Sequence, residues 1–214
     1  MAFTYFFRDR QTLELIARDV VPVLKGFKYI NVWDAGCAHG PEPYSIAMIL
    51  RENMTEFLFR NVRIYATDID STGQFGRRVA DGVYTDDEIK RIPRAIREKY
   101  FAGCGRPGRY RIVDEIRARV SFVQHDLLSL EPIRTGLSLI VCKNVLLHFR
   151  GRQRRDVVLM FGDALRQGGF LVLEHTQALP DGTEHLFERV TSEGQIFRRL
   201  SAAGPTATEE QVSG

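Results

Sequence analysis

A turn with two glycines, Gly36 and Gly40, directly follows an apolar segment near the start of the chain. Glycines allow such a turn to bend tightly and let a ligand approach the backbone closely. The helix expected next begins with Pro41, Glu42 and Pro43, so two backbone N–H donors are missing and a carboxylate is added where a diphosphate would otherwise bind. The turn therefore favours a cationic or neutral nucleotide-type ligand, and S-adenosylmethionine, with its positive sulfonium and amino groups, meets that requirement.

Acidic residues close two further apolar segments. Asp68 lies 28 residues past Gly40, a position from which a carboxylate can accept hydrogen bonds from both hydroxyls of a ribose. Asp126 is placed to bind an adenine amino group, and Leu127 is placed to pack on the ring. A purely structural interpretation stays open for both acids, with Asp68 as a helix cap and Asp126 as a turn residue.

Short apolar segments alternate with amphipathic ones along the chain, which predicts βαβ units and an α/β fold with a parallel sheet covered on both faces. The expected strands are 29–34, 62–68, 120–125, 137–142 and 170–174, followed by a terminal hairpin of 186–190 and 195–200. The expected helices are 10–24 with a kink or break near Pro22, 42–52, 71–80 and 153–166, the last one ended by Gly168-Gly169. Nucleotide-type cofactors bind at the carboxyl ends of strands in such sheets, where the acids described above lie.

A turn-rich segment, 103–108, interrupts the alternation after helical stretches over 85–101. The segments 109–112 and 116–119 that follow have the pattern of paired short strands, so we expect a small antiparallel insertion over 103–119. The tail, 201–214, is small and polar, and we expect it to be disordered.

Composition limits the classes of protein further. The chain has 214 residues, of which 44% are hydrophobic and 27% charged, as in an ordinary soluble globular protein. The net charge of +3 is too small to indicate nucleic-acid binding or a membrane surface, and no apolar run is long enough for membrane insertion. Three widely spaced cysteines form no metal-ligand pattern and suit a reducing compartment. We therefore expect a cytoplasmic protein with no metal.

Four ordered motifs resemble those of the chemotaxis-receptor glutamate methyltransferases of the CheR type. They are Thr4-Tyr5-Phe6-Phe7-Arg8-Asp9, the stretch 35–47 that begins Ala-Gly-Cys-Ala-His-Gly-Pro-Glu, Ala66-Thr67-Asp68-Ile69-Asp70, and the stretch 142–149 that begins Cys-Lys-Asn-Val. The resemblance implies a class I S-adenosylmethionine-dependent methyltransferase fold, Rossmann-like, with a mostly parallel seven-stranded sheet. It further implies that residues 1–200 are the catalytic domain and that 103–119 is the family's β-subdomain, which docks a receptor tail peptide in some members.

The resemblance also implies an activity and site residues. The activity is methyl transfer from S-adenosylmethionine to glutamate carboxylates of a chemoreceptor cytoplasmic domain, with S-adenosylhomocysteine as product. By position, Arg8 matches an arginine near donor and acceptor, and Thr4 its neighbour in the cofactor pocket. Glu42 matches the acid that holds the amino-acid part of the donor, and Asp68 the ribose-binding acid. The remaining cofactor-binding positions are Gly36, Gly40, Asp126, Leu127 and Asn144.

The chain departs from the family pattern at several positions. Lys143 replaces an arginine, which keeps the charge but loses the bidentate fork, and His148 replaces the tyrosine that lines the methyl-transfer site. Ser138 stands where an aspartate is common. The chain also begins at its first motif, so we expect it to lack the helical N-terminal domain usual in the family.

These departures leave alternatives open. The first alternative is a binding or sensor module of the same fold that keeps S-adenosylmethionine but has altered or lost methyl transfer. The second is a dinucleotide-dependent oxidoreductase, which the chemistry of the glycine turn disfavours. A glutamate acceptor, with a reference pKa of about 4.3, needs no general base, whereas a hydroxyl or amine acceptor would make His148 the expected base. The oligomeric state stays open.

Overall fold

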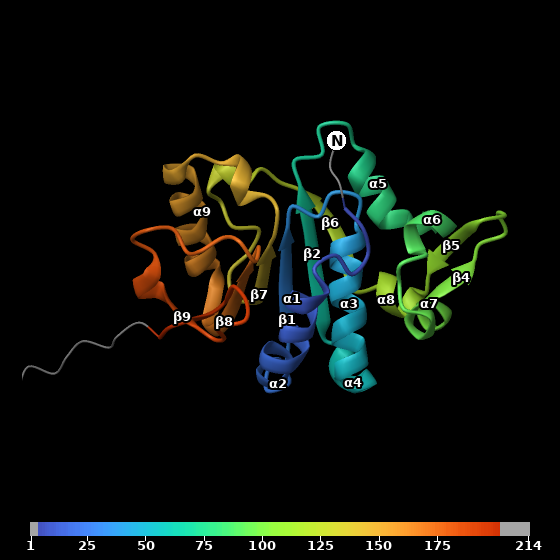
Figure 1. The fold of residues 1–214 in the computed structure, drawn as a ribbon, viewed down its shortest axis with the longest axis horizontal. Helices are drawn as coiled ribbons and strands as arrows, with labels where there is room; N and C mark the ends of the chain where they lie inside the picture. Colours follow the sequence, from blue (N-terminus) through green and yellow to red (C-terminus); the bar gives the residue numbers. More distant parts are fainter. Residues whose placement is uncertain (1–3, 202–214) are drawn as a thin grey trace, which may run out of the picture.

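The computed structural model describes residues 4–201, so the tail predicted over 201–214 lies outside the described residues except for Ser201. Seven strands form the main sheet in the order β6-β2-β1-β7-β8-β10-β9 (Figure 1). Their bounds are β1 Ile30–Ala35, β2 Val62–Asp68, β6 Val120–Gln124, β7 Leu137–Cys142, β8 Leu165–Leu173, β9 Phe187–Arg189 and β10 Ile196–Arg199. The strands from β6 to β8 run parallel, and β10 pairs antiparallel with both β8 and β9. The predicted mostly parallel seven-stranded sheet and its terminal hairpin are confirmed.

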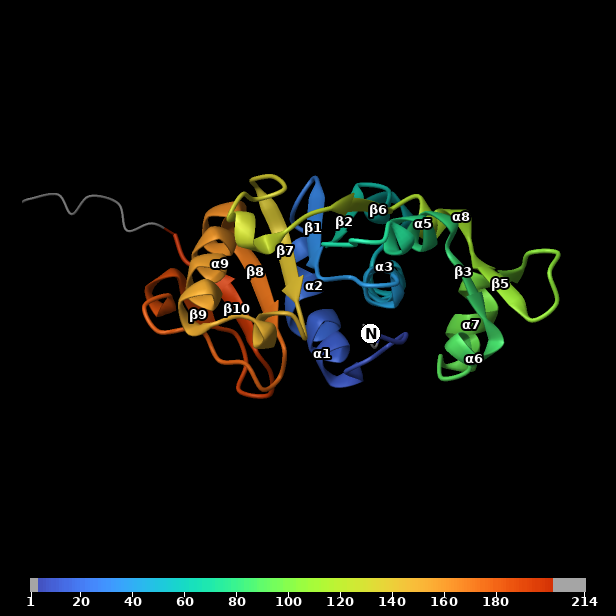
Figure 2. The same ribbon diagram turned by 90° about the horizontal axis from the view of Figure 1, so that it is seen from above.

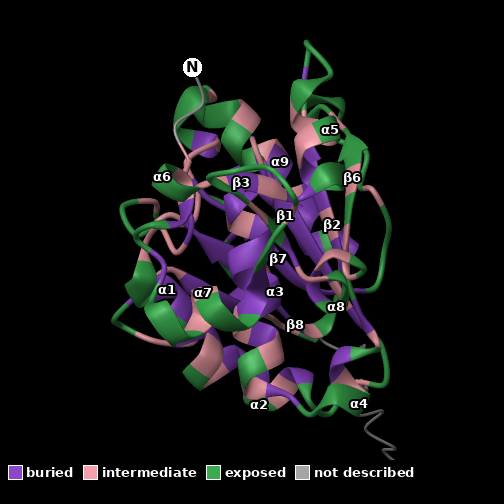
Figure 3. Cartoon of the chain, turned by 90° about the vertical axis from the view of Figure 1, so that its right-hand side faces the viewer, coloured by how far each residue is buried: buried purple, intermediate pink, exposed green. Residues whose placement is uncertain are grey.

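Helices cover both faces of this sheet. Their bounds are α1 Arg10–Leu15, α2 Val21–Leu24, α3 Pro41–Asn53, α4 Glu56–Phe59, α5 Gln74–Asp81, α6 Asp86–Ile89, α7 Arg94–Tyr100, α8 Asp114–Arg117 and α9 Gly151–Ala164, with short 3₁₀ turns at Leu127–Ser129, Leu146–His148 and Glu184–Leu186. In Figure 2, α3 and α9 lie on opposite sides of the sheet. Val32 belongs to the hydrophobic cluster on the α3 side, and the neighbouring Trp33 belongs to the cluster on the α9 side, as strand alternation requires. Buried residues accordingly concentrate in the central strands and in α3 (Figure 3).

The first helical region runs through Pro22 without ending there. A π-helical turn, Ile16–Val20, joins α1 to α2 just before the proline. Proline lacks an N–H group and its ring crowds the preceding carbonyl, and a widened turn accommodates both effects. The predicted helix over 10–24 is therefore present, with the irregularity expected near Pro22.

A second, antiparallel sheet lies beside α3 and α5 at one end of the molecule (Figure 1). It has the order β3-β5-β4, with β3 at Val83–Thr85, β5 at Arg109–Ile112 and β4 at Phe101–Gly103. The expected pairing of 109–112 with 116–119 is wrong, because the second segment forms the end of α8 and the turn after it, and β5 pairs with β3 and β4 instead. Acidic residues open α8, and Ile116 turns into the core on a single helical turn. The strands of this small sheet thus span 83–112 rather than 103–119.

The end of α9 also differs from its prediction. The helix ends at Ala164, and Gly168 and Gly169 lie within β8 rather than stopping the helix. Gly168 has a φ of +70°, and the register between β7 and β8 shifts in this region. The glycine pair therefore allows an irregularity in β8, because glycine adopts a positive φ with little strain.

Candidate active site

A cavity of 540 Å³ opens at the carboxyl ends of the parallel strands. Nine of the ten predicted site residues line it: Thr4, Arg8, Gly36, Glu42, Asp68, Asp126, Leu127, Asn144 and His148. The tenth, Gly40, does not line it. The structure therefore brings together residues from the N-terminal segment and from the loops after β1, β2, β6 and β7.

The loop between β1 and α3 depends on its two glycines in different ways. Gly36 has a φ of +102°, and a Cβ atom there would lie 2.1 Å from the side chain of Val145. The amides of Gly36 and Cys37 donate to the carbonyl of Thr67, which ties this loop to the end of β2. Gly40, with a φ of +95°, packs against the hydroxyl of Tyr84, where a Cβ atom would approach to 2.7 Å. Gly36 thus shapes the cavity, whereas Gly40 shapes the start of α3.

Asp68 connects two of the loops that surround the cavity. Its Oδ2 accepts a hydrogen bond from the backbone amide of Ala38 at 2.9 Å. The helix-capping role considered for it belongs instead to Asp70, whose carboxylate accepts from the amides of Gln74, Phe75 and Gly76. Burial opposes ionisation of Asp70, but these amide bonds outweigh burial and lower its pKa. In the described chain, the Oδ1 atom of Asp68 accepts only a long hydrogen bond, of 3.5 Å, from the Asp70 amide, and Asp68 lines the cavity.

Three ionisable residues form what we call the cavity floor: Glu42 and Lys143 line the cavity, and Asp34 is fully buried near them without lining it. The Lys143 Nζ atom lies 2.9 Å from a carboxylate oxygen of Glu42 and 3.7 Å from one of Asp9. The Lys143 side chain is only 3% exposed. Burial alone would lower its pKa, but Glu42, and Asp9 after it, raise the pKa above its ordinary value. Lys143 therefore stays charged at the bottom of the cavity.

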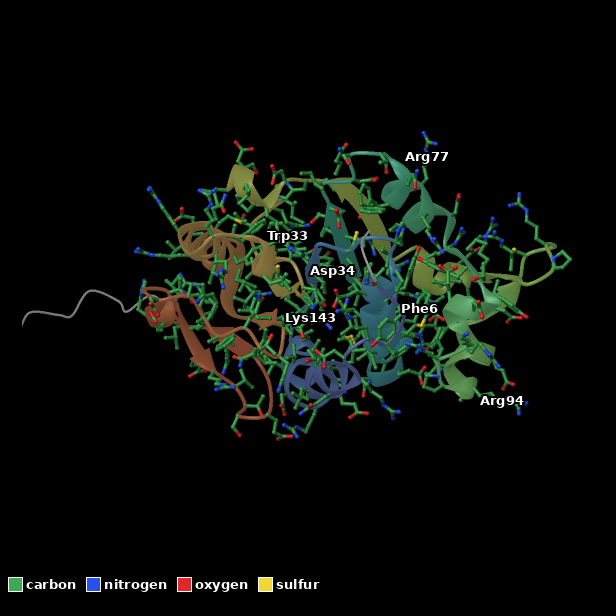
Figure 4. All side chains as sticks on the ribbon, turned by 45° about the horizontal axis from the view of Figure 1, so that its top comes forward. Phe6, Trp33, Asp34, Arg77, Arg94 and Lys143 are labelled. Atoms are coloured by element: carbon green, nitrogen blue, oxygen red, sulfur yellow. The ribbon has the colours of Figure 1, made fainter. Side chains whose placement is uncertain are left out.

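Asp34 is the residue of the site that sequence reasoning missed. It is the penultimate residue of β1, opposite Val141 of β7 and close to Lys143 in Figure 4, and it is fully buried. Within residues 4–201, neither of its carboxylate oxygens has a hydrogen-bond partner. Burial, and then the charge of Glu42, raise its pKa well above the ordinary value. The signal in the sequence was an acid that closes a buried strand directly before a glycine turn.

The N-terminal segment is held against α3 and the small sheet. The amide of Phe7 donates to the Ser45 hydroxyl at 2.9 Å, and this hydroxyl donates to the Pro41 carbonyl at 2.6 Å. Phe6 is buried edge-to-face against Tyr84, with ring centroids 4.7 Å apart. Figure 4 shows Phe6 beside α3. These contacts place Thr4 and Arg8, which flank Phe6 in the sequence, at the cavity wall.

The loop after β6 closes another side of the cavity. Asp126 caps its 3₁₀ turn, because its Oδ1 accepts a hydrogen bond from the amide of Leu128 at 2.9 Å. One of its two carboxylate oxygens therefore has the structural role of a turn residue. Leu127 is buried beside it. His125, which also lines the cavity, packs edge-to-face on Trp33 at 5.5 Å, and its Nε2 atom is buried without a hydrogen-bond partner in the described chain. Burial lowers the pKa of His125, so its ring is neutral at pH 7.

The loop after β7 brings the two remaining predicted residues to the cavity. Asn144 has a φ of +59°, in the left-handed region that asparagine tolerates better than most residues. His148 ends the 3₁₀ turn that follows and is exposed at the mouth. No group of three metal-ligating side chains occurs within residues 4–201.

The donor set of the cavity fits S-adenosylmethionine. Glu42 lines the cavity with a carboxylate held by Lys143, and a cationic amino or sulfonium group is attracted to such an acid. Asp68 supplies a further acid, and the loop at Gly36 leaves space that a Cβ atom would fill. Leu127 supplies an apolar wall for a ring. A diphosphate would instead face the carboxylates of Glu42 and Asp68, which disfavours a dinucleotide.

Comparisons with known proteins agree with this chemistry. Residues 2–196 match the family described as "CheR methyltransferase, SAM binding domain". Chemotaxis protein methyltransferase 2 of Vibrio cholerae is 32% identical over 181 residues, covering 82% of this chain and 62% of that protein. Chemotaxis protein methyltransferase 1 of Pseudomonas aeruginosa is 31% identical over 204 residues, covering 91% of this chain and 73% of that protein. This chain thus spans less than two thirds of the length of the Vibrio relative.

Among solved structures, magnesium protoporphyrin IX methyltransferase from Synechocystis PCC 6803 with bound S-adenosylmethionine is 14% identical, with a TM-score of 0.48, and covers 90% of this chain and 80% of that one. Within residues 4–201, no helix is both long and apolar enough to cross a membrane. The family match covers most of the chain and names the predicted cofactor, which confirms S-adenosylmethionine. The chain therefore belongs to the CheR methyltransferase family, and residues 2–196 are its S-adenosylmethionine-binding domain.

Proposed function

We propose that this protein transfers the methyl group of S-adenosylmethionine to glutamate carboxylates of a chemoreceptor-like protein. The observation that carries the proposal is that Arg8 and His148 line one cavity together with Glu42, Lys143 and Asp68. Family membership and the chemotaxis methyltransferase relatives support the same activity.

When bound, S-adenosylmethionine supplies an electrophilic methyl group on a positive sulfonium. The residues of the floor would hold its amino-acid part, with Glu42 kept in place by Lys143. Asp68 would accept hydrogen bonds from the ribose, and the wall formed by Asp126 and Leu127 would receive the adenine. The chain itself supplies charge complementarity and a water-poor site rather than a covalent partner.

The acceptor carboxylate needs orientation more than activation. A glutamate, with a reference pKa of about 4.3, is already ionised at neutral pH, so its oxygen can attack without a general base. Arg8 lines the cavity and would orient that carboxylate by charge-assisted hydrogen bonds. His148 at the mouth would contact the acceptor side chain, in place of the tyrosine of the family pattern.

We further propose that residues 1–200 act as one catalytic domain in the cytoplasm, with the sheet β3-β5-β4 as a docking subdomain. The described cysteines are free thiols, which suits a reducing compartment. The proposed acceptor domain would be encountered in the same compartment.

The first test is calorimetric titration with S-adenosylmethionine and S-adenosylhomocysteine. Asp68→Ala is expected to weaken binding by at least about tenfold, since a charged hydrogen-bond acceptor is worth about 1.5–3 kcal/mol. Asp163→Ala, which removes an exposed acid of α9, is the matched control and should bind like wild type.

The second test is transfer itself. The purified cytoplasmic fragment of a chemoreceptor is incubated with the protein and with methyl-labelled S-adenosylmethionine. The labelled fragment is then treated with mild alkali. A carboxyl methyl ester releases volatile methanol under these conditions, whereas a methylated amine does not. Binding of the donor without any transfer to the fragment would contradict the proposed activity and favour the sensor module.

A further inference from the structure

A second concavity, of 480 Å³, lies between α5 and the small sheet. Five arginines line it, and four of them have no acidic partner in residues 4–201: Arg77 on α5, Arg106 in the loop before β5, and Arg109 and Arg111 on β5. All four are exposed, and Figure 4 shows Arg77 projecting outward from α5. We call this surface the arginine groove.

The charge of the groove is not neutralised by the protein. Asp81 is the one acid among the described residues that line it. A fifth arginine on the wall, Arg78, is bound by Glu88, but in residues 4–201 no ion pair involves any of the four groove arginines. By contrast, Arg10 and Arg94 on other helices each pair with a glutamate four residues later. The groove therefore gathers four uncompensated positive charges from three segments in one concavity.

The composition of the groove limits its ligand. Guanidinium groups bind carboxylates and phosphates with paired hydrogen bonds. The described walls carry no aromatic ring for stacking a base, and Val83 is their main apolar side chain. Small-molecule sites are mostly apolar, and single-stranded nucleic acids bind with aromatic stacking, so neither ligand fits these walls well. Carboxylate side chains on the surface of another protein fit them best.

A short segment connects the cavity to the groove, and it is compact because the amide of Gln74 donates to the Asp70 carboxylate. Ile69 lines the cavity and Gln74, five residues later at the start of α5, lines the groove. A protein that inserts one side chain into the cavity would therefore lie close to the arginines.

We propose that the arginine groove binds an acidic segment of the methyl-accepting protein, adjacent to the glutamate that enters the cavity. This inference rests on the proposed function and adds to it a determinant of acceptor specificity. Recognition occurs through side-chain charge on the face formed by α5 and β5, so acceptors with acidic residues beside the methylated glutamate are favoured.

Kinetics of methylation of the receptor fragment test the proposal. The double reversal Arg77→Glu with Arg109→Glu is expected to raise the KM for the fragment by about tenfold or more, because like charges then face each other across the interface. The kcat and the affinity for S-adenosylhomocysteine should not change. Lys25→Glu, an exposed charge reversal at the far end of α2, is the matched control and should leave the KM unchanged. A fragment whose flanking acidic residues are changed to glutamine should lose affinity for wild type but not for the double variant.

Cys104 provides an independent readout that does not need activity. It is partly exposed on the groove wall, whereas Cys37 and Cys142 are buried. The receptor fragment should protect Cys104 of the wild-type protein from alkylation by N-ethylmaleimide, as measured by mass spectrometry, and high salt should abolish the protection.

The outcomes separate this inference from the proposed function. The docking role would be overturned if the double variant methylates the fragment with an unchanged KM and the fragment does not protect Cys104 of the wild-type protein. The proposed methyltransferase activity would still be supported by that result. Protection of Cys104 without any methylation would support the groove as a docking site and overturn the activity. Protection by inorganic pyrophosphate but not by the fragment would show a small-anion site and overturn the proposal.

Discussion

The cavity floor and the arginine groove both concentrate charge, in opposite physical settings. In the floor, Lys143 is 3% exposed and bound by Glu42, with Asp34 buried beside them. In the groove, the arginines are exposed and have no acidic partner in the described chain. Buried charges must be compensated within the fold, so they constrain stability and the shape of the ligand site. Solvated charges cost the fold little and stay available to a partner.

The largest effect is expected from Lys143→Met. The substitution keeps the side-chain length but leaves the partly buried carboxylates of Glu42 and Asp9 without their buried cation. Breaking a buried ion pair in this way should lower the free energy of unfolding by about 3–5 kcal/mol, measured by urea denaturation at pH 7. Lys143→Arg keeps the charge and is the control. A decrease in the free energy of unfolding of less than about 1 kcal/mol would show that the charges of the floor are solvated. The floor and the groove would then no longer differ in this respect.

Asp34→Asn should change the pH dependence of stability. Because the folded-state pKa of Asp34 is raised, its contribution to stability is full below its unfolded pKa and is lost as pH rises toward the folded pKa. Asparagine does not titrate, so the variant should gain stability relative to wild type between pH 5 and 8, by at most about 1.4 kcal/mol per pH unit. Denaturation at four pH values measures this slope. For the exposed control Asp163→Asn, the difference from wild type in the free energy of unfolding should not change with pH. The same result for Asp34→Asn would contradict the prediction.

Asp70→Ala should cost about 1–2 kcal/mol, as the loss of a carboxylate cap does. Three amides at the start of α5 lose their acceptor. Since the pKa of Asp70 is lowered, its contribution is present above its unfolded pKa and disappears as pH falls through the folded pKa. The difference between variant and wild type should therefore vanish in acid. Asp81→Ala, at the exposed end of the same helix, is the control; an effect of Asp70→Ala that persists in acid would indicate lost packing instead.

The smallest effect is expected from Arg111→Gln in the groove. This side chain is exposed and forms no ion pair within the described residues, so the free energy of unfolding should change by less than about 0.5 kcal/mol. Urea denaturation at low and moderate salt measures it. A loss above about 1 kcal/mol would mean that Arg111 supports the fold, and the groove would then no longer be a free docking surface.

Sequence patterns were reliable where one physical rule dominated. Apolar segments that end in an acid predicted β1 and β2, and the rule that ligands bind at the carboxyl ends of parallel strands brought Asp68 and Asp126 to one cavity. The patterns failed where a short segment fits both a strand pattern and a helix pattern. Residues 116–119 alternate like a strand, but acids at the preceding positions and one buried isoleucine make a helical turn there.

The sequence by itself determined the α/β class of the fold, the glycine turn after the first strand and the acids at the strand ends, because periodicity and strand ends are local properties. Only the tertiary structure decided that Lys143 pairs with Glu42 and Asp9, that Asp34 is buried without a partner, and that arginines from α5 and β5 share one groove. Burial and charge compensation depend on which distant segments meet, and this is set by packing of the whole chain.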